Sequence, residues 1–216
     1  MTRKSSYNSA QSYLGLYVGL GLIFLIIGFL PFLDVEQQKN LLTEGGLFES
    51  LTVYLYIFCL ILICISWPLQ KILSHWYLCA LIILFALREL DYDKAHFTHG
   101  VLKSRQYFSD LVGLPELLIS IVVLIIILTV LALIVLKERN NFIKGIIDLK
   151  QSQLAVLASI ILVIVTKTID GMERKFGIDL SPSGERFALI VEEVGEMGIP
   201  IMFAIAILSW RNKSQT

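Results

Sequence analysis

Acidic side chains occur inside or at the ends of several long apolar segments, where other charges are few. Glu49 follows a glycine pair at the start of one segment, and Glu196 lies within another, one helical turn after Glu193. Carboxylates ligate divalent metals, exchange protons and act as general bases. A charge left unpaired in hydrocarbon costs at least about 2.5–3.5 kcal/mol, so these groups need partners or a wet cavity. They are therefore the first candidates for function.

A second set of ionisable residues ends the third apolar segment. Glu89, Asp93 and His96 have i, i+4, i+7 spacing, which places them on one face of a helix. The pairs Asp93/His96 and Glu193/Glu196 have the i, i+3 spacing of ligands in carboxylate metal bundles. Such a set, with one histidine, suits Mn, Fe or Zn. The candidate ligands of a divalent metal are Glu49, Glu89, Asp93, His96, Glu193 and Glu196.

Basic residues near the acids offer a solution without a metal. Arg88 and Lys167 fall within apolar segments, and Asp170 and Arg174 are i, i+4 neighbours. Several carboxylates in a low-dielectric region can share protons, pair with cations or bind a metal. These four residues are therefore candidates for ion pairing or for contact with an anionic lipid headgroup.

Pro200 interrupts the last apolar segment. Because proline has no N–H, the carbonyl of Glu196 loses its intrahelical donor, and Gly195 and Gly198 weaken the same stretch. We expect a helix break or kink at this point. A carbonyl released beside a deep carboxylate is an oxygen ligand for a cation, as in the broken helices of transporters. A neighbouring side chain or water can equally satisfy it.

Composition indicates a membrane protein. The 216 residues are 56% hydrophobic, with a mean hydropathy of +0.75. Eighteen basic and eighteen acidic residues give zero net charge, which argues against a nucleic-acid partner. The three cysteines lie within apolar segments and form no CxxC pattern, as is typical of packing residues. Membrane lipids are the expected partners.

Apolar segments of roughly 20 residues recur along the chain, the length that spans a hydrocarbon core of about 30 Å. They do not alternate in polarity, which excludes a barrel. The sequence therefore predicts an all-α integral membrane bundle of about six transmembrane helices, in a single domain (1–216). The expected helices are 13–33, 48–67, 72–90, 114–136, 151–172 and 187–209. The first has spanning length and no cleavage site, so we expect it to be retained.

Two short patterns predict helix contacts and ends. Gly15 and Gly19 have the spacing that lets two helices approach closely, either within the chain or between chains in an oligomer. Ser181 followed by Pro182 predicts an N-cap and the first turn of the last helix.

The acids are distributed unequally across the membrane. An even number of spans puts both termini on one side, and of all the acids only Glu138 and Asp148 lie there. The two sides carry equal numbers of lysine and arginine residues. If the embedded Arg88 and Lys167 are not counted, the side of the termini has more of them, which favours cytoplasmic termini. The expected location is a plasma membrane, crossed several times.

Two segments carry a resemblance. Residues 43–52 read TEGGLFESLT, and residues 192–196 read EEVGE. They resemble the start of the second helix and the Glu-rich opening of the last helix in a group of uncharacterised bacterial polytopic inner-membrane proteins. In that group a Glu pair stands where this chain has Arg88-Glu89. The resemblance implies a bacterial inner-membrane location and no particular activity.

Three functions remain open. The carboxylate/His site, in the outer part of the bilayer, could bind a divalent metal and act on a lipid-like or membrane-embedded substrate. The same acids and Pro200 could serve a proton- or cation-coupled transporter. The chain could also be a non-catalytic membrane subunit whose acids only pair with Arg88 and Lys167. Because no GxSxG, HExxH, GxxxxGK[ST] or GxGxxG occurs, no standard hydrolase, protease or nucleotide site is supported.

Overall fold

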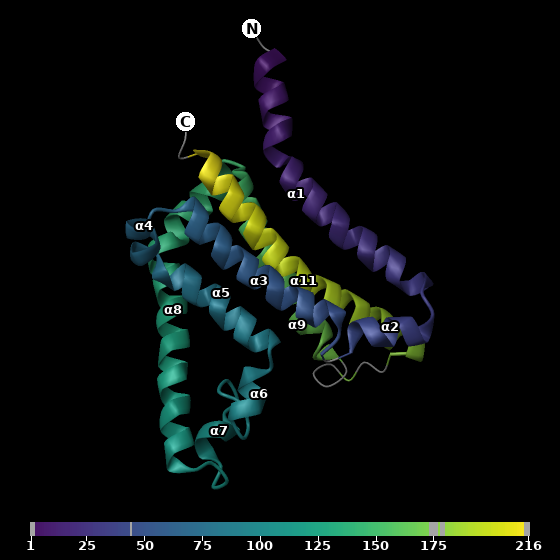
Figure 1. Cartoon of the computed structure of the whole chain (residues 1–216), viewed down its shortest axis with the longest axis vertical. Coiled ribbons are helices and arrows are strands. Elements are labelled where there is room, and N and C mark those ends of the chain that lie inside the picture. Colours follow the sequence, from purple (N-terminus) through teal and green to yellow (C-terminus); the bar gives the residue numbers. More distant parts are fainter. Residues whose placement is uncertain (1–2, 44, 173–176, 178–179, 214–216) are drawn as a thin grey trace. The chain divides into compact units, whose positions relative to one another are not determined.

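The computed structural model describes residues 3–43, 45–172, 177 and 180–213, with side chains from 13 to 210 within those ranges. Every regular element in these ranges is a helix, so the predicted all-helical class is confirmed. The helices are α1 (Arg3–Phe29), η1 (Leu30–Phe32), α2 (Val35–Leu42), α3 (Leu47–Ser66), α4 (Leu69–Ser74), α5 (Trp76–Glu89), α6 (Tyr92–His96), α7 (Arg105–Phe108), α8 (Leu114–Ile147), α9 (Gln151–Ile169) and α11 (Pro182–Lys213) (Figure 1).

Four helical stretches in the described part of the chain are long and apolar enough to cross a membrane. They are Tyr13–Phe32, Val35–Ser66, Leu114–Ile147 and Gln151–Ile169. The expected third and sixth spans are not among them, and α5 has only 14 residues. The count of six spanning helices stays a prediction.

Two expected boundaries are wrong. The helix predicted over 72–90 is divided, because α4 ends at Ser74 and α5 begins at Trp76 after a non-helical His75 (φ −117°, ψ 29°). The loop predicted over 137–150 is helical as far as Ile147. Hydropathy falls at Lys137, but lysine, glutamate and arginine are good helix formers. The end of an apolar run therefore marks a change of surroundings and not the end of the helix.

The last helix begins as predicted and continues where a break was expected. Ser181 Oγ accepts a hydrogen bond from the Gly184 N–H (3.3 Å), and Pro182 is the first helical residue. The helix then runs through Pro200 without interruption. Pro200 is buried, and the Cys59 thiol of α3 donates to its carbonyl oxygen (3.2 Å). Contact with a neighbouring helix supports the backbone there.

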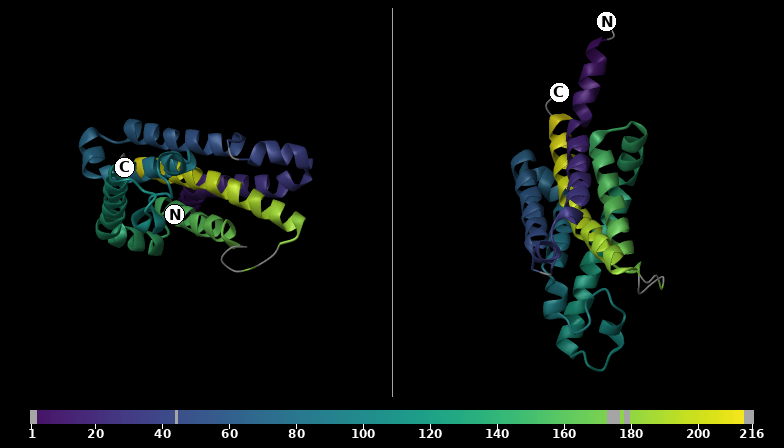
Figure 2. Two further views of the ribbon diagram at one scale, coloured as in Figure 1. Left: turned by 90° about the horizontal axis from the view of Figure 1, so that it is seen from below. Right: turned by 90° about the vertical axis from the view of Figure 1, so that its right-hand side faces the viewer.

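The chain folds into two compact units, although the sequence predicts one domain. The bundle unit comprises Met1–Ser66 and Lys144–Thr216, and the α5–α8 unit comprises Trp67–Ile143. In the bundle unit α11 contacts α1, α2, α3 and α9, so it is the helix that the others share (Figures 1 and 2). Its side chains Ile190, Val194 and Met202 are at most 1% exposed.

Glycines set the spacing of the bundle helices. A Cβ on Gly19 of α1 would lie 2.6 Å from Ile205 Cδ1 of α11, and one on Gly15 would lie 3.0 Å from Gln151 Nε2 of α9. The small residues of α1 therefore permit close contact within the chain, which was one of their two predicted uses. On α11, a Cβ on Gly195 would lie 2.6 Å from Thr166 Cγ2 of α9.

We expect Gly195→Ala to lower the free energy of unfolding by about 1–3 kcal/mol, because the added methyl overpacks the contact between α9 and α11. Thr166→Ser removes the clashing Cγ2 atom and keeps the hydroxyl, so the double variant should recover most of that loss. Gly21→Ala is the control, since nothing lies within 4 Å of the position of its Cβ. Denaturation of detergent-purified protein by SDS measures all four; equal losses in the single and double variants would contradict this packing.

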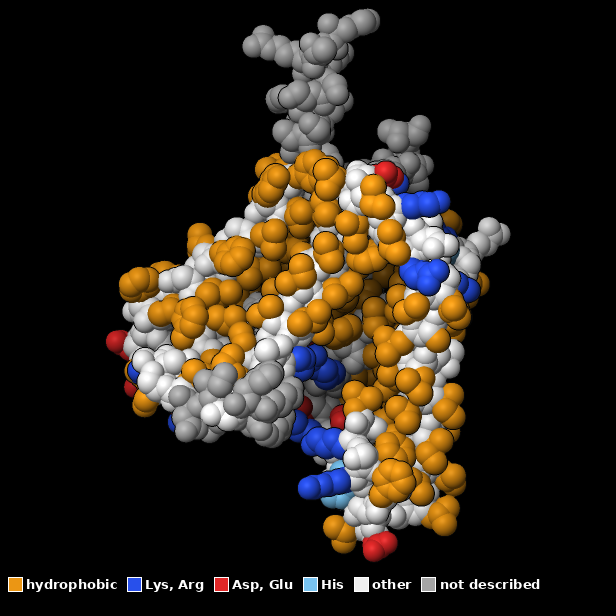
Figure 3. Space-filling model, turned by 180° about the vertical axis from the view of Figure 1, so that it is seen from behind, with side chains coloured by type: hydrophobic (Ala, Val, Ile, Leu, Met, Phe, Trp, Pro, Cys, Tyr) orange, Lys and Arg blue, Asp and Glu red, His pale blue; other side chains and the backbone are white. Residues whose placement is uncertain are grey.

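Outward-facing apolar side chains cover both units (Figure 3). Phe24, Ile65 and Leu136 are 70%, 71% and 79% exposed, and they are three of many large hydrophobic side chains in this position. Surfaces of this kind are typical of helices that face lipid or another protein.

In the α5–α8 unit, one polar contact joins the start of α5 to the distal half of α8. The fully buried Tyr77 donates its hydroxyl to Glu138 Oε1 (2.5 Å). His75 Nε2 lies 3.9 Å from the same oxygen. Glu138, one of the two acids expected on the side of the termini, therefore has a structural partner.

Candidate functional site

A lysine shared by two carboxylates links α9 to α11. Lys167 Nζ lies 3.2 Å from Glu196 Oε1 and 3.1 Å from Asp170 Oδ2. The Glu196 side chain is 12% exposed, whereas those of Lys167 and Asp170 are 41% and 43% exposed. Three of the predicted site residues thus meet in one cluster, here called the Lys167 cluster. Its partners agree with the ion-pairing interpretation of Lys167.

Local structure explains why these side chains meet. Lys167 stands in the last turn of α9, where a cation is favoured by the helix dipole, and Asp170 follows the end of that helix. At Gly195 the backbone of α11 lies against Thr166 of α9. Lys167 follows Thr166 in the chain, and Glu196 follows Gly195. The close approach of the two helices at Gly195 therefore places the Glu196 carboxylate beside Lys167.

The bundle unit contains two further candidate acids, Glu49 and Glu193. Glu49 Oε2 accepts a hydrogen bond from the Gly45 N–H (2.5 Å), so it stabilises the start of its own helix, α3. Gly45 has φ +76°, a conformation that favours glycine. Glu193 is half-buried on α11. Arg174 lies outside the described residues.

In the α5–α8 unit, the three candidate ligands have different partners. Glu89 is 7% exposed, and Arg88 lies 3.3 Å from its Oε1, which is an ion pair between neighbours. Asp93 Oδ1 accepts a hydrogen bond from the Val101 N–H (2.7 Å). His96 stacks on Tyr92, with ring centroids 3.9 Å apart. The predicted i, i+4, i+7 face is also interrupted, since α5 ends at Glu89 and α6 starts at Tyr92.

Among the residues that the structure describes, no three His, Cys, Asp or Glu side chains lie together as a metal site would require. Of the six candidate ligands, Glu49, Glu193 and Glu196 belong to the bundle unit, and the other three to the α5–α8 unit. The metal site stays a prediction.

Sequence reasoning missed a buried polar network that begins at Gln106. Gln106 is fully buried; its Oε1 accepts from the His99 N–H (2.8 Å), and its Nε2 donates to Glu116 Oε1 (2.7 Å) and Ser120 Oγ (3.0 Å). Glu116 also accepts from the Thr98 N–H (2.7 Å). The network fastens the loop after α6 to the first turns of α8. A polar residue in a polar loop carries no sequence signal of burial.

A tyrosine and a glycine complete this loop. The Tyr107 hydroxyl donates to the Val101 carbonyl (2.6 Å), and burial, with a smaller effect of the Asp93 carboxylate, raises the pKa of Tyr107 above its usual value. Gly100 has φ +90°, and a Cβ there would lie 2.5 Å from Asp93 Oδ2. Asp93 is thus held by the loop backbone.

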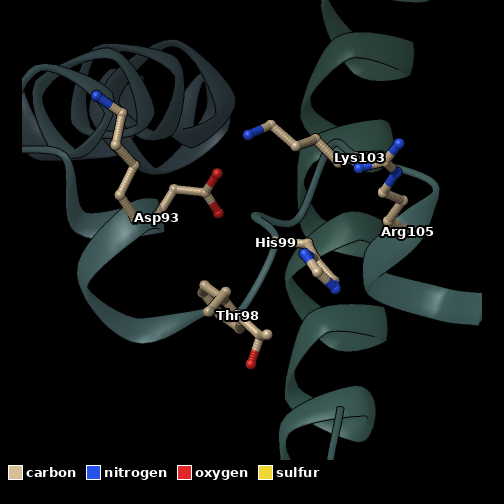
Figure 4. A pocket seen from close by; sticks show the side chains of 7 residues that line it. Asp93, Thr98, His99, Lys103 and Arg105 are labelled. Carbon is tan, nitrogen blue, oxygen red and sulfur yellow. The ribbon is translucent and has the colours of Figure 1, made fainter. Parts of the chain in front are cut away.

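The same loop encloses a polar pocket of about 210 Å³. Figure 4 shows Asp93 and Lys103 directed towards its middle, with His99 and Arg105 around it. The complete lining is Asp93, Lys94, Phe97, Thr98, His99, Lys103 and Arg105. Basic side chains therefore predominate. This pocket includes one predicted metal ligand, Asp93, together with cations of the loop.

A second hollow, almost entirely apolar and about 240 Å³ in volume, adjoins the polar pocket and shares Asp93 and Phe97 with it. We call it the α5–α8 groove. Leucines and Phe85 of α5 line one side, and residues of α8 line the other. The α8 residues are Val123, Ile127 and Leu131.

No protein-family model, curated protein or solved structure matches this chain. The resemblance of residues 43–52 and 192–196 stays an expectation.

Proposed function

We propose that this chain is a multi-pass plasma-membrane protein that carries a proton or another monovalent cation, with Glu196 as the binding carboxylate and Lys167 as its exchangeable counter-charge. The observation that carries the proposal is the position of Lys167 Nζ, between Glu196 at 3.2 Å and Asp170 at 3.1 Å. Membrane insertion is supported by four helices of spanning length and by the exposed apolar side chains. Counting α4 with α5, and α11, gives the six spans of the proposal, with cytoplasmic termini.

The depth of the cluster supports a role in the membrane. From Gln151 to Lys167, α9 rises about 24 Å at about 1.5 Å per residue. With Gln151 at one edge of a hydrocarbon core of about 30 Å, the ammonium group lies in the outer part of the bilayer. Ionisable residues at such depths are costly and commonly mark ion or proton pathways.

The two partners of Lys167 suggest how a cation is exchanged. When a proton or cation reaches Glu196, Lys167 is displaced but keeps Asp170 as a counter-charge, so no ammonium group is left uncompensated in the membrane. Departure of the cation returns Lys167 to Glu196. Because Asp170 is more exposed than Glu196, it holds Lys167 on the aqueous side while the cation is bound.

A divalent metal is a less suitable occupant of this cluster. The lysine already supplies the positive charge that Glu196 and Asp170 require, and an ammonium group competes with a metal for the same oxygens. A carrier of a proton or monovalent cation is therefore consistent with the contacts of Lys167 with Glu196 and Asp170. A non-catalytic subunit would use them too, but only for stability, and the experiment below separates the two.

Proteoliposomes with an internal pH dye test the proposal. A potassium diffusion potential should drive proton entry, or sodium entry with the corresponding dye, through the wild type. Glu196→Gln should reduce that flux at least tenfold, because the amide carries no negative charge and does not take up a proton at neutral pH. Glu185→Gln, in the exposed first turn of the same helix, is the matched control and should transport normally. A wild type no faster than protein-free vesicles for protons, sodium and potassium would rule out the carrier.

Lys167→Gln gives a second, independent readout. Without the exchangeable ammonium, bound cation is no longer displaced, so flux should fall while binding to Glu196 remains. If Glu196→Gln only lowers the melting temperature and leaves flux unchanged, the pair is structural and the chain is better described as a membrane subunit.

A further inference from the structure

The strongest unassigned feature of the α5–α8 unit is a basic pocket that continues into an apolar groove. The pocket is lined by loop residues that include Lys103, Arg105 and His99. The groove is lined by leucines and Phe85 of α5 and by aliphatic residues of α8. Because the two hollows share Asp93 and Phe97, they form one amphipathic depression. Its two ends have the polarity of a lipid, charged at one end and apolar at the other.

Among the described residues, basic side chains in the pocket outnumber acidic ones. Lys94 pairs with Asp91 (3.0 Å), and Asp93 is engaged by the Val101 N–H. In the part of the chain that the structure describes, Lys103 Nζ and the Arg105 guanidinium group have neither a hydrogen-bond acceptor nor an acidic partner. Two cations thus face a cavity large enough for a small anionic group (Figure 4).

The backbone that presents these cations is held firmly. Gln106, next to Arg105, is fully buried and bonded to Glu116 and Ser120, while Tyr107 donates to the Val101 carbonyl. A loop fixed at both ends loses little conformational freedom when a ligand binds. The basic pocket is therefore better prepared for an anion than lysines on a mobile loop would be.

We propose that this depression binds an anionic phospholipid, with its phosphate at Lys103, Arg105 and His99 and an acyl chain in the α5–α8 groove. Arginine and lysine donate charge-assisted hydrogen bonds to phosphate oxygens. Any lipid can fill an apolar groove. The unbalanced cations at its polar end are what select an anionic one.

The groove makes a testable distinction from a simple anion site. A free phosphate can use only the polar pocket, whereas a lipid also buries its chain against Phe85, Val123 and Ile127. The lipid should therefore bind at least a hundredfold more tightly than inorganic phosphate. The proposal is independent of the carrier function, since all its residues lie outside the bundle unit.

Native mass spectrometry of the detergent-solubilised full chain tests the site. Phosphatidylglycerol should bind at least tenfold more tightly than phosphatidylcholine with the same acyl chains. The double variant Lys103→Gln/Arg105→Gln should lose that preference while retaining weak binding of both lipids. Lys144→Gln, an exposed cation on α8 outside the pocket, is the control and should preserve it.

A second variant probes the groove. Ile127→Trp fills it, so the affinity for both lipids should fall at least tenfold while the protein keeps its melting temperature. Equal affinity of the wild type for the two lipids, or an undiminished preference in the double variant, would overturn the proposal. Inorganic phosphate binding as tightly as phosphatidylglycerol would also overturn it, because the groove would then contribute nothing.

Discussion

Replacing Gln106 with leucine should destabilise the α5–α8 unit by about 2–4 kcal/mol. Leucine has nearly the same volume but no polar atoms, so the His99 N–H, Glu116 Oε1 and Ser120 Oγ each lose a partner beside a side chain that is 0% exposed. Each buried polar group left unsatisfied costs about 1–3 kcal/mol, although Glu116 and Ser120 keep other hydrogen bonds.

The measurement is hydrogen–deuterium exchange of the loop amides, combined with thermal unfolding in detergent. Exchange should accelerate over residues 97–109 before the rest of the chain is affected, because the network holds that segment. Gln70→Leu is the control, since Gln70 is an exposed glutamine of α4 in the same unit. Identical protection in Gln106→Leu and wild type would mean that the loop is held by other contacts. Because the same loop carries Lys103 and Arg105, this variant should also weaken phosphatidylglycerol binding.

The contact between Lys167 and Glu196 should show a coupling energy of about 1–3 kcal/mol in a double-mutant cycle. Removing one partner of a buried pair costs about 3–5 kcal/mol, because the other charge is left without compensation. The Lys167 side chain is 41% exposed, and solvent screening reduces the figure accordingly. Lys167→Met and Glu196→Gln should each destabilise the bundle unit, and the double variant should lose less than the sum.

Unfolding of the four proteins in SDS mixed micelles supplies the cycle. The pair Lys94–Asp91 of the α5–α8 unit is the matched comparison, because its side chains are 64% and 41% exposed and it should couple by less than about 1 kcal/mol. Additive losses for Lys167 and Glu196 would show that the pair contributes no more than an exposed one. The double-mutant cycle measures stability, and the proteoliposome assay measures flux. A large coupling energy together with unchanged flux in Glu196→Gln would favour a non-catalytic membrane subunit.

The all-helical fold class could be predicted from the sequence because helix formation depends on local chemistry. In lipid, runs of about 20 apolar residues form helices, because a helix satisfies each backbone group within the segment. Ser181 and Pro182 started α11 as predicted because an N-cap involves only the adjacent turn. The C-terminal end of α8 and the interruption at His75 could not be predicted, because hydropathy reports the surroundings of a residue rather than its hydrogen bonding.

The candidate site divides in the same way. Sequence alone determined which residues carry costly charge in apolar segments, and it selected Lys167, Asp170 and Glu196 by residue type and depth. Only the tertiary structure decided that the lysine contacts both carboxylates, because that depends on how closely α11 approaches α9 at Gly195. Likewise, only the fold buries Gln106 and places Lys103 and Arg105 beside a cavity. Partners distant in the chain are set by packing, which residue spacing within one helix does not encode.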